Sequence, residues 1–254
     1  MAANLGHRVL VFERSNRAGG QVLLAAAPRS RAALAGVVAY RVGELERLGV
    51  ELRLGTDAAE AAVLAERPEA VVIATGAAPL SLVGLSEADG CLTAWSLLAG
   101  AGGGRLRRGS LALLLDDGHC GRETCAPAEW LGERGLRVEI VTPANFVGAG
   151  VPAESLVPLL RRLRAAGAPF SPLTRAVSIR RGNVLLADLM TGEHRQVAVD
   201  LVVVNAGRRA DAGADGLAAS LTAEGIPVQQ VGDCLAPRGL GEAIREGHAA
   251  ALAF

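Results

Sequence analysis

Short runs of β-branched and other apolar residues alternate along this chain with longer stretches, rich in Ala, Leu and Arg, that have a helical period. Runs of the first kind predict buried strands, and the longer stretches predict amphipathic helices. Strands and helices that alternate in this way form βαβ units, in which helices cover a mostly parallel sheet. The sequence therefore predicts an α/β fold.

The predicted elements are spread over the whole chain of 254 residues. Strands are expected at residues 8–12, 50–54, 70–74, 110–115, 137–142, 176–179, 184–187, 197–204 and 228–231. Helices are expected at residues 31–48, 58–66, 126–134, 154–166 and 240–252. The first of these helices has apolar residues every three or four positions, and Gly49 is suited to end it in the left-handed conformation.

The chain has little sequence ahead of its first predicted strand. A complete dinucleotide-binding unit has a G-x-G-x-x-G turn between its first strand and first helix, about 20 residues before an acidic residue that binds a ribose. Here the acidic residue at the strand end is Glu13, and only residues 1–12 precede it. We therefore expect residues 1–13 to be the end of a helix, a turn and the second strand of such a unit, without its first strand and glycine turn.

Two domains are expected. A glycine-rich stretch at residues 100–104 precedes the strand at residues 110–115, with which a second βαβ unit begins. Gly207 and the polar residues after it return the chain to the first unit. The sequence thus predicts two Rossmann-like nucleotide-binding domains, one at residues 1–104 and 206–254 and the other at residues 105–205. The second would be inserted in a discontinuous first domain that is truncated on its N-terminal side.

Composition limits the classes of partner. Lys+Arg and Asp+Glu both number 26, so the net charge is zero and no patch for nucleic acid or an anionic membrane is expected. Hydrophobic residues make up 50% of the chain and the mean hydropathy is +0.32, which predicts a packed core. The longest uncharged run, residues 70–86, is interrupted by Gly76, Pro79 and Gly84, so a membrane span is not expected.

The cysteines indicate a reducing compartment. Four scattered cysteines without a signal segment do not form a secreted disulfide framework, so we expect a soluble cytoplasmic protein. Cys120 and Cys125 have the spacing of a redox disulfide, but in glutathione-reductase-like proteins that pair follows the Gly-Gly segment of the first domain. Neither a redox disulfide nor a metal site is expected, because the cysteines and the four histidines have no ligand spacing.

The first predicted strand and the loop after it carry candidate nucleotide-binding residues. Glu13 stands at a strand end, where its carboxylate can accept hydrogen bonds from both hydroxyls of a ribose. A solvated glutamate at a strand end would have the same position. Gly19 and Gly20 allow the backbone to approach a ligand closely, although paired glycines also simply form turns.

Two later strands end in similar candidates. The turn Ala74-Thr75-Gly76 follows a buried strand, at the sheet edge where open α/β sheets bind ligands. An ordinary strand-end turn would look alike. Gly232 and Asp233 follow the strand at residues 228–231, and Asp233 can hydrogen-bond a polyol beside the N-terminus of the next helix.

Taken together, these segments resemble one family. The order E-R-x-x-x-x-G-G-Q, then A-T-G, then G-D-C-x-A-P-R-x-L-x-x-A-I-x-x-G-H resembles the C-terminal half of the NADH:flavin oxidoreductases related to trimethylamine dehydrogenase and 2,4-dienoyl-CoA reductase. The resemblance covers residues 6–251. In that family a flavin barrel with an iron-sulfur cluster precedes two nucleotide-binding domains, and only those two domains are represented in this sequence.

The resemblance implies a cofactor role for each matched position. Glu13 would bind the adenosine ribose of FAD, Gly20 and Gln21 would line the pyrophosphate and flavin region, and Asp233 would bind the ribityl chain. In some members this pocket holds only ADP. The matched positions are Glu13, Arg14, Gly19, Gly20, Gln21, Ala74, Thr75, Gly76, Gly232, Asp233, Ala243 and Ile244.

The remaining implied roles concern the flavin ring. Thr75 and Gly76 would turn beneath the cofactor, and Ala243 and Ile244 would lie near the ring. FMN and the iron-sulfur cluster would belong to the barrel, supplied by a lost N-terminal region or by a partner chain.

The second domain departs from the fingerprint for NAD(P)H. Its turn begins Asp116-Asp117-Gly118, reaches Gly121 after two further residues, and lacks the three glycines. Two carboxylates there would repel a pyrophosphate. The following strand ends in Thr142-Pro143 and offers neither a ribose-binding acid nor an arginine for a 2′-phosphate. Asp117, Gly118 and Gly121 are therefore weak nicotinamide candidates.

Three hypotheses for function remain open. The first is an FAD-dependent oxidoreductase module that passes a hydride from NAD(P)H to flavin, which requires orientation of the two rings more than acid–base catalysis. The second is a non-catalytic remnant or docking subunit that binds an adenine nucleotide. The third is an incomplete gene product without independent function.

Overall fold

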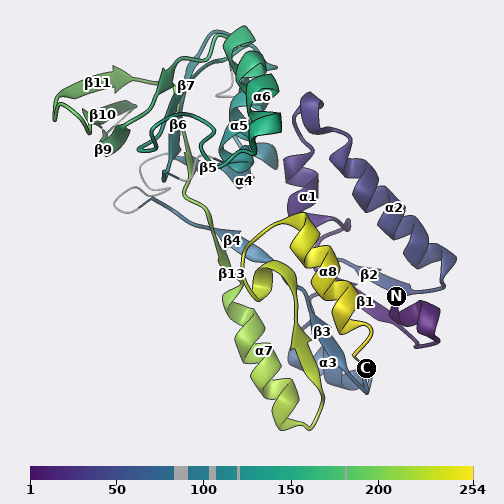
Figure 1. Cartoon of the computed structure of the whole chain (residues 1–254). Helices are drawn as coiled ribbons and strands as arrows, with labels where there is room; N and C mark the ends of the chain where they lie inside the picture. Colours follow the sequence, from purple (N-terminus) through teal and green to yellow (C-terminus); the bar gives the residue numbers. More distant parts are fainter. Residues whose placement is uncertain (83–90, 103–106, 119–120, 181, 254) are drawn as a thin grey trace. The chain divides into compact units, whose positions relative to one another are not determined.

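The structure is a computed structural model that describes residues 1–82, 91–102, 107–118, 121–180 and 182–253. The chain forms two compact units (Figure 1). Unit 1 comprises Met1–Val22, Ala35–Ala78 and Arg208–Phe254, and unit 2 comprises Leu23–Leu34 and Pro79–Gly207. The division between the units after Ala78 thus lies earlier in the chain than the domain boundary predicted at 104/105. The reason is that β5 (Leu92–Thr93) pairs with β12 (Leu201–Asn205), inside the sheet of unit 2.

Unit 2 contains the parallel sheet that the sequence predicts. Its strand order is β5-β12-β6-β7-β8, and every pair in it is parallel. The remaining strands of this sheet are β6 (Leu111–Asp116), β7 (Arg137–Val141) and β8 (Phe170–Ser171). The helices of the unit are α4 (Ala94–Leu98), α5 (Arg122–Gly132) and α6 (Ala153–Ala165). The α/β class is confirmed.

Alternate residues of β6 face two different cores. Ala112 and Leu114 pack with α4, α5 and α6, whereas Leu113 and Leu115 pack against a second sheet. That sheet is antiparallel, has the order β11-β10-β9, and comprises β9 (Thr174–Arg180), β10 (Asn183–Asp188) and β11 (His194–Ala198). Both faces of β6 are therefore covered, as a continuous apolar run in a parallel strand requires.

The strand predicted at residues 197–204 is wrong as a single element. The structure divides it into β11 and β12, which belong to different sheets. Asp200 lies at the division, and its carboxylate accepts a hydrogen bond from the Leu111 N–H at 2.8 Å. β11 is exposed along most of its length and β12 is buried throughout. A run of valines spans both and conceals the change of sheet.

Unit 1 has four short parallel strands in two pairs. They are β1 (Leu10–Glu13), β2 (Glu51–Leu54), β3 (Val71–Ile73) and β14 (Val228–Gln230). β1 pairs with β2 and β3 pairs with β14. Among the described residues, no hydrogen bond joins the two pairs into one sheet. In the strand order 3-2-1-4-5 of a Rossmann domain, the position between β1 and β3 is that of the first strand.

Three helices of unit 1 fit the prediction, and two further helices, α1 (Gly20–Ala25) and α7 (Ala212–Ala223), were not predicted. α2 (Leu34–Arg47), α3 (Glu60–Ala65) and α8 (Leu240–Ala250) lie within the predicted ranges, and α1 is a short addition. α7 replaces part of the polar stretch expected after Gly207. Gly213 and Gly216 weaken its helical signal, but Ala214 packs with Ile73 and Cys234 in a small core that stabilises the helix.

Two of the connections between the units are short strands that form a ribbon. β4 (Ala77–Pro79) leads out of unit 1 and β13 (Arg208–Ala210) leads back into it, and the two strands pair with each other. Gly76 accepts a hydrogen bond from Asp211 at one end of the ribbon, and Gly207 accepts one from Leu80 at the other. No helix in the described part of the chain is long and apolar enough to cross a membrane.

Amide exchange is expected to differ strongly between the two units. Val72, in the middle of β3, is 42% exposed, whereas Leu113 and Leu114 of β6 are fully buried. Because local opening is easier where few apolar groups are buried, amides of β1 and β3 should exchange about a hundredfold faster than those of β6 and β12. Hydrogen–deuterium exchange mass spectrometry measures this ratio. Equal protection of β3 and β6 would contradict the expectation.

Candidate functional site

A cluster of polar side chains joins three segments that the sequence assigned to a nucleotide site. The guanidinium of Arg208 donates from Nη1 to Gln21 Oε1 at 2.7 Å and to Asp233 Oδ2 at 2.5 Å. Its Nη2 donates to the backbone oxygen of Arg238 at 2.7 Å. Gln21, Arg208, Asp233 and Arg238, here called the Arg208 cluster, all belong to unit 1.

The carboxylate of Asp233 is held at both oxygens. Oδ2 accepts from Arg208, and Oδ1 accepts from the backbone N–H of Arg238 at 2.9 Å. The side chains of Arg208 and Asp233 are each only 14% exposed. A carboxylate has about four acceptor positions, so Asp233 keeps acceptor capacity for hydroxyl groups of a ligand.

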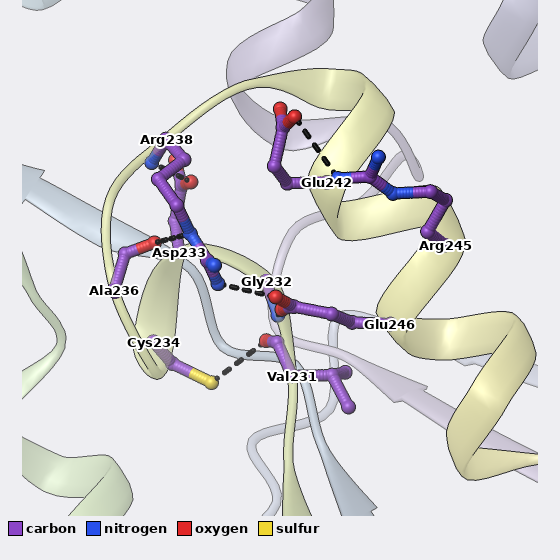
Figure 2. Close-up of polar contacts among 9 residues, drawn as sticks. All are labelled: Val231, Gly232, Asp233, Cys234, Ala236, Arg238, Glu242, Arg245 and Glu246. Carbon is purple, nitrogen blue, oxygen red and sulfur yellow. Dashed lines mark hydrogen bonds and ion pairs between the residues drawn. The ribbon is translucent and has the colours of Figure 1, made fainter.

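α8 lies against the residues that follow β14 (Figure 2). Glu246 accepts a hydrogen bond from the Gly232 N–H at 2.7 Å and forms an ion pair with Arg238. Gly232 has a φ of +68°, and a Cβ there would lie 3.2 Å from Ala243 Cβ. A larger residue would push α8 away, so glycine allows the strand end and the helix to approach closely.

The turn after β3 lies next to Gln21. Gly76 has a φ of +83°, and a Cβ there would lie 3.3 Å from Gln21 Nε2. Ala74 and Thr75, before it, are exposed. The structure therefore brings the predicted Gly-Gly-Gln and Ala-Thr-Gly segments together. Gly19 and Gly20 have positive φ angles of 122° and 46° at the start of α1, which few other residues adopt.

Glu13 and Arg14 stand apart from this cluster. Glu13 is half-buried at the end of β1, where its Oε1 accepts from the Ser15 N–H at 2.8 Å. Its backbone oxygen accepts from Thr56 at 3.0 Å. Arg14 is exposed in the following loop. In the described residues, neither side chain contacts the Arg208 cluster.

Ala243 and Ile244, expected near the flavin ring, line a shallow depression of about 300 Å³. The other lining residues are Met1, Arg41, Gly247 and His248, all in unit 1. Ile244 is 38% exposed. The depression is mainly apolar, as the surroundings of an aromatic ring are.

The turn after β6 in unit 2 is built around a buried carboxylate. Asp116 Oδ1 accepts from the Thr124 hydroxyl at 2.6 Å, and Oδ2 accepts from the Thr142 hydroxyl at 2.7 Å and the Gly118 N–H at 2.9 Å. Asn205 donates to Thr124 Oγ1 at 2.8 Å. The Gly118 N–H of this turn thus already donates to a carboxylate inside the protein.

The three weak nicotinamide candidates surround that network. Asp117 is half-buried after Asp116, and Gly118 has a φ of +105°, with Pro143 Cγ 3.1 Å from where its Cβ would be. Gly121 is the N-cap of α5. These positions lie between the end of β6 and the start of α5, and the described residues there that carry charge, Asp116 and Asp117, are acidic.

Two cysteines near the candidate sites are buried in the part of the chain that the structure describes. Cys125 is fully buried in α5, and Cys120 lies outside the described residues. Cys234 donates from Sγ to the backbone oxygens of Ile73 and Val231, each at 3.1 Å. Within the described ranges, no three His, Cys, Asp or Glu side chains are grouped to hold a metal ion.

Two characterised proteins are similar to most of this chain. A probable N-methylproline demethylase of Rhizobium meliloti is 33% identical over 213 residues, 82% of this chain and 30% of that protein. An N,N-dimethylglycine/sarcosine dehydrogenase of Chromohalobacter salexigens is 36% identical over 222 residues, 83% of this chain and 31% of that protein. No protein-family model matches the sequence.

Comparison with solved structures points to the same family as these sequence relatives. A 2-naphthoyl-CoA reductase complexed with 2-naphthoyl-CoA superposes with a TM-score of 0.86 at 25% identity, over 100% of this chain and 37% of that one. The chain belongs to the NADH:flavin oxidoreductase family. Thioredoxin reductase of Lactococcus lactis shares the fold, with a TM-score of 0.70 at 17% identity over 99% of this chain and 91% of that one.

The chain spans about a third of the family members it matches. Membership of this flavoprotein family implies a flavin cofactor and nucleotide binding. The polar groups of unit 1 are suited to bind a flavin nucleotide. Asp233 offers carboxylate oxygens and Gln21 offers an amide, and the absence of a Cβ at Gly76 and Gly232 lets Gln21 and Ala243 lie close to the two strand ends.

Three residues of the site were missed by sequence reasoning. Arg208 and Glu246 lie far in sequence from Gln21, and only the fold brings them to it and to Gly232. Arg238 lies in the A-P-R segment of the closing run, which could have drawn attention to it. Arg208, at the start of β13, and Glu246, in α8, have the sequence pattern of ordinary surface residues.

Proposed function

We propose that unit 1 binds FAD and that the chain, together with a flavin barrel outside it, passes reducing equivalents from NAD(P)H to flavin. Bound flavin would supply the chemistry, accepting a hydride as the nicotinamide is oxidised. The observation that carries the proposal is the Arg208 cluster, because it unites Gln21 with Asp233 beside the Gly76 turn. These are the positions that the family resemblance links to the flavin and its ribityl chain.

The residues of unit 1 have distinct tasks in this proposal. Asp233 accepts hydrogen bonds from ribityl hydroxyls, and Gln21 orients its amide toward the cofactor. Glu13, at the end of β1, binds the adenosine ribose. Ala243 and Ile244 provide the apolar depression near the ring. FMN, an iron-sulfur cluster and the substrate belong to the barrel.

A strand, a glycine turn and a helix from outside this chain would complete unit 1. Support comes from the two strand pairs, which are not joined in the described residues, and from Val72, which is exposed in the middle of a strand. Unpaired strand edges at the centre of a sheet leave backbone donors and acceptors without partners, and a parallel strand would satisfy them. The source would be the region that the longer family members have in addition, or a partner chain.

A second candidate function follows from unit 2. The buried Asp116 and the neighbouring Asp117 place negative charge where a pyrophosphate would lie, which disfavours NAD(P)H there. In this alternative, unit 1 binds ADP or FAD and the chain serves as a docking subunit without nicotinamide oxidation.

Absorption spectroscopy distinguishes the candidates. The chain is incubated with FAD, freed of unbound cofactor and scanned in the visible range, and NADH or NADPH is then added without oxygen. Retained flavin that NAD(P)H bleaches is the result expected for the oxidoreductase. Retained flavin that stays oxidised, or retention of ADP without retention of FAD, favours the docking subunit. Loss of both FAD and ADP on gel filtration would contradict both candidates.

A further inference from the structure

Arg208 is the centre of the candidate site, although no sequence motif marks it. Its guanidinium makes hydrogen bonds to Gln21, Asp233 and the backbone of Arg238, from three separate segments. An arginine at a strand end is more commonly a surface residue, but this one is only 14% exposed. Its neighbour Arg209, on the same strand, is exposed. The two arginines therefore have different environments.

The contacts of Arg208 fix the chemical character of both partners. Because Gln21 Oε1 accepts from Nη1, the amide nitrogen of Gln21 remains as a donor and lies on the side of Gly76. Because Asp233 accepts at both oxygens from Arg208 and Arg238, its carboxylate plane is set. The cluster thus presents one donor and one acceptor in a fixed arrangement.

The planar guanidinium is suited to this task. Its N–H groups have fixed directions, so one nitrogen can bind Gln21 and Asp233 while the other binds a backbone oxygen. A lysine ammonium is a point charge and would not keep both side chains oriented.

We propose that Arg208 is a positioning residue that holds Asp233 and Gln21 in the geometry required by the ribityl part of a flavin nucleotide. The inference rests on the proposed function. It adds that the arginine comes from β13, the strand by which the chain returns to unit 1. Formation of the β4–β13 ribbon therefore places the arginine on which the site depends.

The test compares FAD with ADP, which has no ribityl chain. Dissociation constants are measured by isothermal titration calorimetry for the 254-residue chain and for Arg208→Met, Arg208→Lys and Arg209→Met. Arg208→Met should weaken FAD binding about tenfold, the effect of one lost charge-assisted hydrogen bond, and leave ADP binding unchanged. Arg208→Lys should restore only part of the loss. Arg209→Met should bind both nucleotides as the unaltered chain does.

Combined variants supply the second measurement. If Arg208 acts through Asp233 and Gln21, then adding Arg208→Met to the pair Asp233→Asn and Gln21→Ala should weaken FAD binding no further than that pair does. Parallel losses for FAD and ADP would mean that Arg208 is merely structural, and unchanged FAD binding would also overturn the inference. Failure of the unaltered chain to bind either nucleotide would instead overturn the proposed function, and the inference with it.

Discussion

Replacing Asp116 with alanine is expected to lower the free energy of unfolding of unit 2 by about 3–5 kcal/mol, because a buried, hydrogen-bonded carboxylate is removed. Asp116 is 5% exposed and accepts hydrogen bonds from two threonine hydroxyls and one backbone N–H. Thr124 and Thr142 are themselves buried. Without Asp116, their hydroxyls would lose an acceptor that no water can easily replace.

The position of the network explains the size of the effect. Asp116 ends β6, Thr142 follows β7, Asn205 ends β12, and Thr124 lies in the first turn of α5. The Asp116 carboxylate therefore links the ends of β6 and β7 to α5, and Thr124 extends the network to the end of β12. Loss of a shared acceptor leaves several donors unsatisfied, which costs more than the loss of one surface hydrogen bond.

Tryptophan fluorescence during urea unfolding measures this change without interference from unit 1. The chain has two tryptophans, Trp95 in α4 and Trp130 in α5, and both belong to unit 2. The single tyrosine, Tyr40, lies in α2 of unit 1. The tryptophan signal therefore reports the unit that contains Asp116.

Asp188→Ala is the matched control. Asp188 accepts hydrogen bonds from the N–H groups of Thr191 and Met190, which hold the pKa of its carboxyl below the ordinary value, but it lies at the end of β10, next to an exposed turn. Its replacement should shift the unfolding midpoint far less. Asp116→Asn keeps the shape and should have an intermediate effect, so it remains informative if Asp116→Ala does not fold. Equal midpoints for the Asp116 and Asp188 variants would show that the buried network is not a principal source of stability.

Local pattern was sufficient to predict β6 and β7 of unit 2. The strands around Leu113 and Ile140 were predicted from short apolar runs, since such runs can only be buried in a sheet covered on both faces. Asp233 was predicted as a site residue for a related reason, because the carboxyl ends of parallel strands meet at one edge of a sheet.

The rest depends on contacts between distant residues. The pairing of Arg208 with Gln21 and Asp233 follows from chain topology, which a local pattern does not encode. α7 was missed because its glycines suggest a loop, and packing around Ala214 outweighs that preference. The division between β11 and β12 was missed because valines suit both an edge strand and a buried one.

A second large effect is expected from Glu129→Leu in α5. The side chain of Glu129 is 4% exposed, and its carboxylate binds Arg31 Nε at 2.9 Å, Arg162 Nε at 2.6 Å and the Ser30 hydroxyl at 3.0 Å. These contacts attach the segment around Arg31 to α5 within unit 2. Removing one partner of a buried ion pair typically costs about 3–5 kcal/mol, because the other charge remains buried without its partner.

Limited trypsin digestion tests where this loss acts. The segment contains Arg29 and Arg31, and Arg31 is only 14% exposed in the ion pair with Glu129. In Glu129→Leu, cleavage after these two arginines should accelerate about tenfold or more, measured by mass spectrometry of the fragments, because the segment detaches before the unit unfolds. Glu133→Leu is the matched control, since Glu133 accepts a hydrogen bond from the Arg29 N–H at an exposed position and, in the described residues, has no ion pair with Arg31.

The double variant Arg31→Met with Glu129→Leu separates charge from packing. An apolar pair of similar volume often replaces a buried ion pair without loss of stability, so the double variant should be more stable than Glu129→Leu. Within the segment, Arg29 is then the remaining trypsin site, and the rate of cleavage after it should return toward the original value. If the double variant were as labile as the single one, the ion pair would not be what attaches the segment. The apolar contacts of Ala27 with the core formed by β6, α4, α5 and α6 would then be what attaches the segment to unit 2.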